Sequence, residues 1–285
     1  MKSWGSEVIS TKIQEVQCSH VHQEELLVHY SKMEQPIFIN EEQHHGSLLC
    51  DQTILKCMTE NLIVIEPFNP LNLGPASYDV TLGEWYYREQ DGLNNVYNMY
   101  SKGDVERVWG IPRQAKTVAQ WKASRELLPI RSLENISDDD RIIWIKPGES
   151  ILAHTNEFIG GRKHIACIMS ARSSVGRNFL TVCNCANFGG VGFVNRYCCE
   201  ITNRSRQYNI PLVVGRRIAS ILFLATDKDS ATSYNGKYQS TDDIDELKKT
   251  WSPEQMLPKL YLDREIVTTT PRFKRQDQII GMPSL

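Results

Sequence analysis

The most constraining feature of this sequence is a series of short apolar and β-branched runs between residues 141 and 225. Turn-forming pairs such as Pro147-Gly148, Gly160-Gly161 and Gly189-Gly190 separate them. The runs cover residues 142–145, 150–153, 165–168, 197–202 and 218–224. Short strand-like runs with breaks at such intervals are typical of a β-sandwich or β-barrel. The sequence therefore predicts an all-β core.

The segment before this core predicts a few further elements. Residues 51–58 are expected to form a helix with Asp51 as its N-cap, and the apolar residues 62–65 that follow are expected to form a strand. Residues 77–83 also have strand character. A helix is predicted near residues 117–127.

The two ends of the chain are polar. Residues 1–46 are rich in Gln, Glu and His and are interpreted as an extension. Residues 226–285 are predicted to be a flexible tail with one helix near residues 242–250.

Charge and hydropathy exclude some classes of function. Lys and Arg number 32 against 34 Asp and Glu, a net charge of -2, so phosphate binding would need a local basic cluster and nucleic acid is not an expected partner. No apolar run reaches the roughly 18 residues of a membrane span, and the N-terminus lacks the apolar stretch of a signal peptide. A cytoplasmic protein without membrane contact is expected.

The eight cysteines are scattered through the chain. The closest pairs are Cys183/Cys185 and Cys198/Cys199, whose spacing is compatible with zinc half-sites. Reduced cysteines that are buried on strands as small apolar side chains are the simpler interpretation.

A zinc-deaminase signature is present only in part. His22-Gln23-Glu24 matches its His-x-Glu half, but no Pro-Cys-x-x-Cys follows to supply the other ligands. The adjacent His44 and His45 could bind a metal, although histidines in a polar segment are usually solvated. The residues therefore disfavour a zinc cytidine deaminase, and no metal site is predicted.

A turn rich in hydroxyl and guanidinium groups follows one of the strand-like runs. Residues 170–177, Ser-Ala-Arg-Ser-Ser-Val-Gly-Arg, contain two arginines, three serines and a glycine. Such a turn offers backbone N–H groups, hydroxyls and guanidinium forks to a phosphate chain. A solvent-exposed turn explains the same residues equally well.

Glu200 lies in a strand-like run with small neighbours. Strand alternation places Cys198, Glu200 and Thr202 on one face, and Tyr197, Cys199 and Ile201 on the other. A glutamate on a solvated strand face is the common case. The small, weakly polar neighbours keep open the alternative of a buried carboxylate with a perturbed pKa.

Taken together, several blocks resemble those of the dCTP deaminase family and occur in the same order. They are Asp51-x-x-Ile54, Ile63-Val64-Ile65-Glu66-Pro67-Phe68, Pro75-Ala76-Ser77-Tyr78-Asp79-Val80-Thr81-Leu82-Gly83, Ala171-Arg172-Ser173-Ser174-Val175-Gly176-Arg177 and Gly215-Arg216-Arg217-Ile218-Ala219. Tyr234-x-Gly236-Lys237-Tyr238-Gln239 resembles the family's C-terminal phosphate-covering segment. The resemblance spans residues 47–240, which leaves residues 1–46 and 241–285 as extensions.

The resemblance implies a mainly β fold: a distorted, dUTPase-like and jelly-roll-like β-barrel with a few short helices. It implies a homotrimer with its sites at the subunit interfaces. The implied reaction is zinc-independent hydrolysis of dCTP to dUTP and ammonia, with Mg²⁺ carried by the triphosphate.

The resemblance also implies roles for individual residues. Glu200 corresponds to the general base, Ser173 to the hydroxyl that helps to hold the attacking water, and Arg177 to the arginine that orients the glutamate. Ala186 corresponds to a residue whose backbone lines the pocket for water and base. The implied substrate-binding residues are Arg172 and Ser174 at the triphosphate, Phe193 and Tyr234, and the closing tail of Lys237, Tyr238 and Gln239.

The implied chemistry is self-consistent. Attack at C4 needs a water that is deprotonated as it attacks and a proton that returns to the ring and to departing ammonia, so one carboxyl can serve both steps. Burial would raise the pKa of Glu200, and Arg177 would lower it by favouring the charged form.

The sequence departs from the family in one hairpin. The family reads Ala-Gly-Phe-Ile-Asp-Pro-Gly-Phe, whereas residues 186–193 read Ala-Asn-Phe-Gly-Gly-Val-Gly-Phe. Gly190 therefore replaces an aspartate that, in bifunctional relatives, contacts the deoxyribose and activates water for triphosphate cleavage. Its loss predicts no diphosphatase activity, and Gly189-Gly190 predicts a pliable hairpin. Ser240 and Thr241 replace a Gly-Gln pair in the tail.

Three functions remain compatible with the sequence. The first is a deaminase that forms dUTP. The second is a related enzyme with a shifted substrate, such as a modified dCTP, CTP or dUTP. The third is a nucleotide-binding regulatory trimer with little turnover, because a shared scaffold does not guarantee chemistry.

Overall fold

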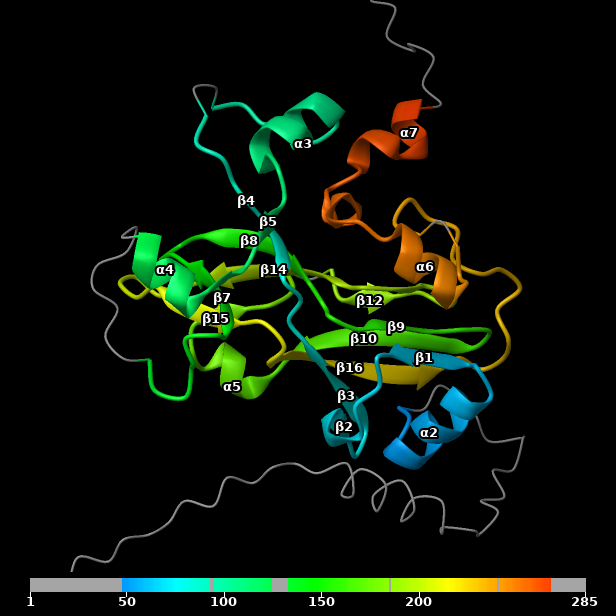
Figure 1. The fold of residues 1–285 in the computed structure, drawn as a ribbon. Coiled ribbons are helices and arrows are strands. Elements are labelled where there is room, and N and C mark those ends of the chain that lie inside the picture. Colours follow the sequence, from blue (N-terminus) through cyan, green and yellow to red (C-terminus); the bar gives the residue numbers. More distant parts are fainter. Residues whose placement is uncertain (1–47, 93–94, 125–132, 185, 240, 268–285) are drawn as a thin grey trace, which may run out of the picture. The chain divides into compact units, whose positions relative to one another are not determined.

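The fold is that of a computed structural model, which describes residues 48–92, 95–124, 133–184, 186–239 and 241–267 (Figure 1). All of these belong to a compact unit that spans residues 44–285. The predictions made for residues 1–46, including the two histidine motifs, lie outside the described residues.

Two five-stranded antiparallel sheets form most of the core. The first has the order β12-β10-β16-β3-β2 and the second β11-β14-β8-β4-β5. In the first sheet the strands are β12 (Phe188–Gly189), β10 (Ile165–Ala171), β16 (Arg217–Ala225), β3 (Ser77–Thr81) and β2 (Leu73–Gly74). In the second they are β11 (Leu180–Thr181), β14 (Cys198–Asn203), β8 (Ser150–His154), β4 (Trp85–Arg88) and β5 (Arg113–Gln114).

Two three-stranded sheets complete the β core. One has the order β1-β9-β13, with bounds Ile63–Glu66, Phe158–Gly161 and Val194–Asn195. The other has the order β15-β7-β6, with bounds Ile210–Val213, Arg141–Ile145 and Lys116–Thr117. Each strand-like run identified between residues 141 and 225 falls on a strand, so the mainly β prediction is confirmed.

The helices are short. They are α2 (Asp51–Thr59), α3 (Lys102–Trp109), α4 (Val118–Ser124), α5 (Ser173–Gly176), α6 (Ile244–Thr250) and α7 (Arg264–Val267), with 3-10 turns η2 (Pro70–Asn72), η3 (Pro253–Met256) and η4 (Leu260–Leu262). In Figure 1, α3 and α7 lie above the strands and α2 lies below them. None of the helices in the described ranges has the length and apolar character needed to cross a bilayer.

The predicted N-cap of the first helix is wrong by one residue. Cys50 has extended backbone angles and precedes the helix, whereas Asp51 is its first helical residue. The Asp51 carboxylate accepts a hydrogen bond from the backbone N–H of Gln52 (2.9 Å). An acidic side chain in the first turn still interacts favourably with the helix dipole.

Strand alternation along β14 is confirmed. Cys199 and Ile201 are fully buried, whereas Cys198, Glu200 and Thr202 are half-buried on the opposite face. The buried face packs into the main apolar core, which includes Tyr78, Met169 and Phe223. This packing fixes which face Glu200 must occupy, because a shift of one residue would place its carboxylate in that core.

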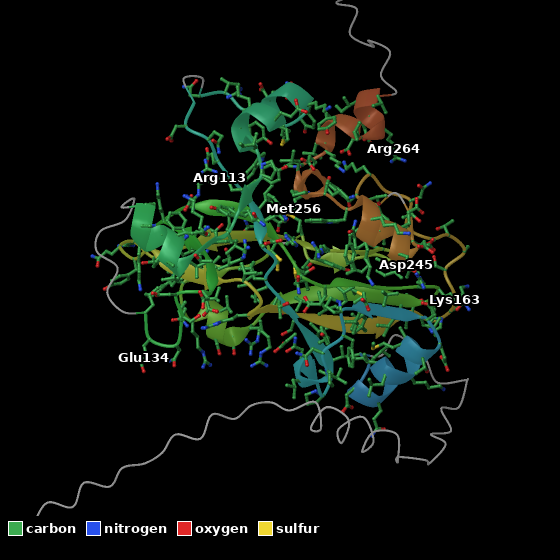
Figure 2. All side chains as sticks on the ribbon, viewed as in Figure 1. Arg113, Glu134, Lys163, Asp245, Met256 and Arg264 are labelled. Carbon is green, nitrogen blue, oxygen red and sulfur yellow. The ribbon has the colours of Figure 1, made fainter. Side chains whose placement is uncertain are left out.

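The prediction of a flexible C-terminal tail is wrong for the described part of the tail. The predicted helix is present as α6, and its Leu247 is fully buried against Phe158 and Val194. Farther along, Met256 is buried with Tyr87 and Leu152, and Figure 2 shows it between the C-terminal segment and the strands. A few well-spaced apolar residues are enough to dock this otherwise polar segment.

Candidate active site

Glu200 lies in the second sheet, on the strand next to its central strand β8. It lies on β14 opposite Leu152 of β8. The backbone N–H of Asn184 donates a hydrogen bond to Glu200 Oε2 (3.3 Å). Burial raises the pKa of the Glu200 carboxyl, and the hydrogen bond from Asn184 only partly opposes this shift.

Glu200 opens into a cavity of about 590 Å³. Of the residues predicted for the site, Ala186, Phe193, Tyr234 and Tyr238 line the same cavity. Its volume is in the range usual for small-ligand sites. Glu200 and Arg196 are the two charged residues among the described residues that line it.

The predicted closing tail is docked on the hairpin that precedes β14. The Gln239 side chain accepts a hydrogen bond from the backbone N–H of Val194 (2.7 Å) and donates one to the carbonyl of Gly192 (2.9 Å). Asn195 Nδ2 donates to the carbonyl of Tyr238 (2.9 Å). These bonds place Tyr238 in the cavity wall, while Lys237 is ion-paired with Asp263 and does not line the cavity.

The predicted Ser/Arg block lies apart from this cavity. Ser173, Ser174 and Arg177 are exposed on or beside α5, and none of them lines the Glu200 cavity of its own chain. Arg172 is half-buried, and its Nε lies 3.1 Å from Asp79 Oδ2. The same carboxylate oxygen lies 3.2 Å from Nη1 of Arg217. Within one chain, the structure therefore does not bring the block to Glu200.

Part of the cavity wall was not identified from the sequence. Trp251, Gln255, Met256 and Pro258 contribute to it from the segment predicted to be flexible. Arg196 contributes from the residues just before β14. Alternation along an extended chain would have placed Arg196 on the face of Glu200.

Two buried titratable groups lie outside the cavity. Glu157 accepts hydrogen bonds from the backbone N–H (2.9 Å) and the hydroxyl (2.8 Å) of Thr81, and burial raises its pKa. His154 is buried, which lowers its pKa to about 4. A neutral imidazole agrees with its Nε2 accepting a hydrogen bond from the backbone N–H of Trp85 (3.2 Å).

The cysteines of the described ranges are free. Cys167 and Cys199 are buried on β10 and β14, as predicted for small apolar side chains. Within the same ranges, no three His, Cys, Asp or Glu side chains gather closely enough to hold a metal ion.

The two glycines of the hairpin have different surroundings. A Cβ at Gly189 would lie 1.8 Å from the hydroxyl of buried Tyr197, whereas the nearest atom to a Cβ at Gly190 is a ring carbon of Phe188 at 3.7 Å. Gly189 is therefore required by close packing rather than by the pliability predicted from sequence. Gly190 leaves room for a side chain beside the cavity.

This difference gives a prediction for stability. Gly189→Ala is expected to lower the free energy of unfolding by about 1–3 kcal/mol, because the new methyl group must displace the Tyr197 ring. The matched variant Gly190→Ala is expected to change it by less than about 0.5 kcal/mol. Denaturant unfolding of both variants measures the two values. Equal effects would contradict the packing account.

Comparison with known proteins agrees with this architecture. A family model described as "dCTP deaminase-like" matches residues 48–226, more than half of the chain. The chain belongs to the dCTP deaminase-like family. The resemblance identified from sequence blocks is thereby confirmed.

The sequence identity to individual members of this family is low. A "dCTP deaminase, dUMP-forming" of Sulfurihydrogenibium sp. is 27% identical over 196 residues, which cover 67% of this chain and 91% of the relative. The protein of the same name from Methanocaldococcus jannaschii is 27% identical over 178 residues, covering 62% of this chain and 81% of that relative. The crystal structure of 2'-deoxycytidine 5'-triphosphate deaminase from Agrobacterium tumefaciens aligns with a TM-score of 0.44 at 15% identity. The alignment covers 63% of this chain and 48% of that chain.

Proposed function

We propose that the protein is a dCTP deaminase that converts dCTP and water to dUTP and ammonia. The observation that carries this proposal is a half-buried glutamate, Glu200, with a raised pKa in a nucleotide-sized cavity. Family membership supports it, as do relatives whose names specify dCTP deaminases.

In this proposal Glu200 is the general base. Its carboxylate accepts a proton as the water oxygen bonds to C4 and passes that proton to ring N3. It then takes the proton of the new C4 hydroxyl and gives it to the amino group, so that the C4–N bond breaks, C4=O forms and ammonia leaves. The hydrogen bond from the N–H of Asn184 to Oε2 leaves Oε1 free of that contact and able to face the water. The backbone of Ala186 lines the same cavity. A raised pKa makes Glu200 a stronger base than an ordinary glutamate.

The exposed Ser/Arg block would serve the cavity of a neighbouring subunit in a homotrimer. Ser173 would help to hold the attacking water, and Arg177 would orient Glu200 and favour its charged form. Arg172 and Ser174 would contact the triphosphate with its Mg²⁺. Arg172 is paired with Asp79 of β3 in this structure, so it would contact a phosphate through N–H groups that this pair does not use.

The residues of the docked tail and its hairpin would differ in how they contribute to substrate binding. Phe193, Tyr234 and Tyr238 line the cavity and would contact the nucleotide. Gln239 would act through its two bonds to the hairpin. Lys237 would reach a phosphate only by exchanging its Asp263 partner for that phosphate.

The expected product is dUTP, although the named relatives are dUMP-forming. Gly190 supplies no carboxylate to activate water for triphosphate cleavage. An assay that measures ammonia and pyrophosphate together is expected to find ammonia from dCTP and no pyrophosphate. Pyrophosphate equal to the ammonia would show that another residue replaces the missing aspartate.

The same assay with CTP, dCMP and dUTP tests the alternatives. Ammonia from CTP in preference to dCTP would indicate a shifted substrate. Tight dCTP binding without either product would indicate a regulatory trimer.

The pH dependence of the reaction follows from the burial of Glu200. The proton-accepting form is the carboxylate, so kcat/KM is expected to fall as the pH decreases through the pKa of the folded protein. Because burial raises this pKa, the acidic limb is expected at higher pH than an ordinary glutamate would give. A pH profile, with circular dichroism at each pH to verify folding, measures its position. A limb at the ordinary glutamate pKa would contradict the effect of burial.

A further inference from the structure

Arg196 and Glu200 face the same cavity from one extended stretch of chain. They are four positions apart, which places their Cα atoms about 13 Å apart. Cys198 lies between them on the same face, and all three side chains line the cavity. The cavity wall therefore carries a carboxylate and a guanidinium from one extended stretch of chain.

The guanidinium of Arg196 makes cation–π contacts with two aromatic rings. Its central carbon lies 4.8 Å from the centroid of the Phe158 ring and 4.5 Å from that of the Trp251 ring. Two such contacts restrict the position of the guanidinium and use none of its N–H donors in conventional hydrogen bonds. Trp251 thereby links the C-terminal segment to the strands.

This fixed guanidinium has no polar partner in the described part of the chain. Its Nε is buried without a hydrogen bond, and no ion pair or hydrogen bond involves its other nitrogens. Burial lowers its pKa, and the charges of Glu84 and Glu157 oppose that shift without contacting it. The buried Nε is a costly donor to leave without a partner, and the side chain as a whole is half-buried, so its other N–H groups can reach solvent or a ligand.

Arg196 lies in the part of the cavity wall that also includes Trp251 of the C-terminal segment. Its neighbour Asn195 donates hydrogen bonds to the carbonyl of Tyr238 (2.9 Å) and to Oε1 of Gln255 (3.0 Å). From Glu200 the same cavity extends to Tyr238 and Arg196, which leaves room there for the phosphates of a nucleotide whose base lies at Glu200.

We propose that Arg196 is a substrate-binding residue that receives a phosphate group of the nucleotide. This rests on the proposed function for the orientation of the nucleotide. The C-terminal segment then has a role in binding, because Trp251 holds the arginine that meets the phosphate.

A binding measurement tests this proposal directly. In a Glu200→Gln background, which holds dCTP without turnover, Arg196→Met is expected to weaken dCTP binding by about 10- to 100-fold, the effect of a lost charge-assisted hydrogen bond. Methionine keeps an unbranched apolar side chain in contact with the two rings but removes the charge and the N–H donors. Deoxycytidine, which has no phosphate, is expected to bind with an affinity changed less than about twofold. Unchanged dCTP affinity, or equal losses for both ligands, would overturn the proposal.

Two other variants serve as controls. Arg206→Met removes an exposed arginine outside the cavity and is expected to leave dCTP binding unchanged. Lys248→Met removes the second basic group of a smaller cavity that Arg196 also borders, where Lys248 is paired with Glu66 (2.6 Å). If Lys248→Met weakens binding as much as Arg196→Met does, the anion binds in that smaller cavity and the proposal is wrong.

A second substitution covers the case in which Arg196→Met does not fold. Arg196→Lys keeps the charge but loses the planar fork, so dCTP binding is expected to weaken by about 3- to 10-fold with deoxycytidine unaffected. An equal loss for both ligands, or no loss, would again contradict the phosphate contact.

Titration with inorganic tripolyphosphate separates this proposal from the proposed reaction. Tripolyphosphate is expected to bind the native protein and to lose affinity in the Arg196 variants, whether or not dCTP is deaminated. Binding through Arg196 without ammonia release would refute the deaminase and retain the phosphate contact. Ammonia release from dCTP, together with undiminished tripolyphosphate binding in both Arg196 variants, would refute the phosphate contact and retain the deaminase.

Discussion

Glu200→Gln is expected to lower kcat for dCTP deamination by about 10²- to 10⁴-fold, the usual contribution of a positioned general base. Glutamine has nearly the same shape and still accepts a hydrogen bond from the N–H of Asn184, but it cannot take a proton from water. The affinity for dCTP is expected to change much less than kcat, because the lost interaction belongs to the transition state. Steady-state ammonia release, together with calorimetric dCTP binding, measures both quantities.

A matched glutamate provides the control. Glu60 ends α2 at the surface, where its carboxylate lies 3.9 Å from Nζ of Lys56. Glu60→Gln is expected to leave kcat unchanged. A folded Glu200→Gln protein that releases ammonia at the parent rate would rule out Glu200 as the base.

Two inactive variants are expected to restore activity when their subunits are mixed. Ser173 is exposed and does not line the Glu200 cavity of its own chain, so a complete site would combine Glu200 of one subunit with Ser173 of its neighbour. Glu200→Gln and Ser173→Ala homotrimers each lack one part at every site. Once the homotrimers are removed, every mixed trimer, of either 2:1 composition, would contain both intact parts at one of its three sites, so about a third of the native activity is expected.

Co-expression of two differently tagged chains, followed by purification through both tags, makes this measurement. In the control, Glu200→Gln is mixed with the double variant Glu200→Gln/Ser173→Ala, and no activity is expected because no chain carries Glu200. Mixed trimers no more active than their parents would show that the site does not combine these residues across an interface. Elution of the protein as a monomer would contradict the homotrimer itself.

The β core could be predicted from the sequence because strand alternation and turn-forming residues are local signals. The period of two placed Glu200 opposite Cys199 and Ile201, and the burial of those two residues enforces that arrangement. Alternation could not decide whether the Glu200 face is solvated. That depends on the segment around Met256, which arrives from far along the chain.

The part of the cavity wall that the C-terminal segment forms could not be predicted either, because it too depends on contacts between residues far apart in the sequence. Leu247, Trp251 and Met256 are isolated apolar residues in a polar segment, and no period distinguishes them from surface residues. Their burial depends on pockets formed by Phe158, Val194, Tyr87 and Leu152. Arg196 was missed because its significance lies in its two stacked rings rather than in its local sequence.

For the Ser/Arg block, the sequence indicated the chemistry of the residues but not where they lie. Its residue types indicated phosphate chemistry, and its family resemblance indicated a role at the site. The structure of one chain leaves Ser173 and Arg177 exposed and away from the cavity. A sequence motif specifies which groups are available but not which subunit receives them.

The central claim is tested most directly by a reaction in ¹⁸O-labelled water with Mg²⁺ and dCTP, followed by mass spectrometry of the product. Attack of water at C4 is expected to place one ¹⁸O atom in the uracil ring of dUTP, with ammonia released in equal amount and no label in the phosphates. Label in a phosphate alone would show triphosphate hydrolysis without deamination. Unchanged dCTP would show that the protein binds the nucleotide without converting it, and either result would contradict the proposed function.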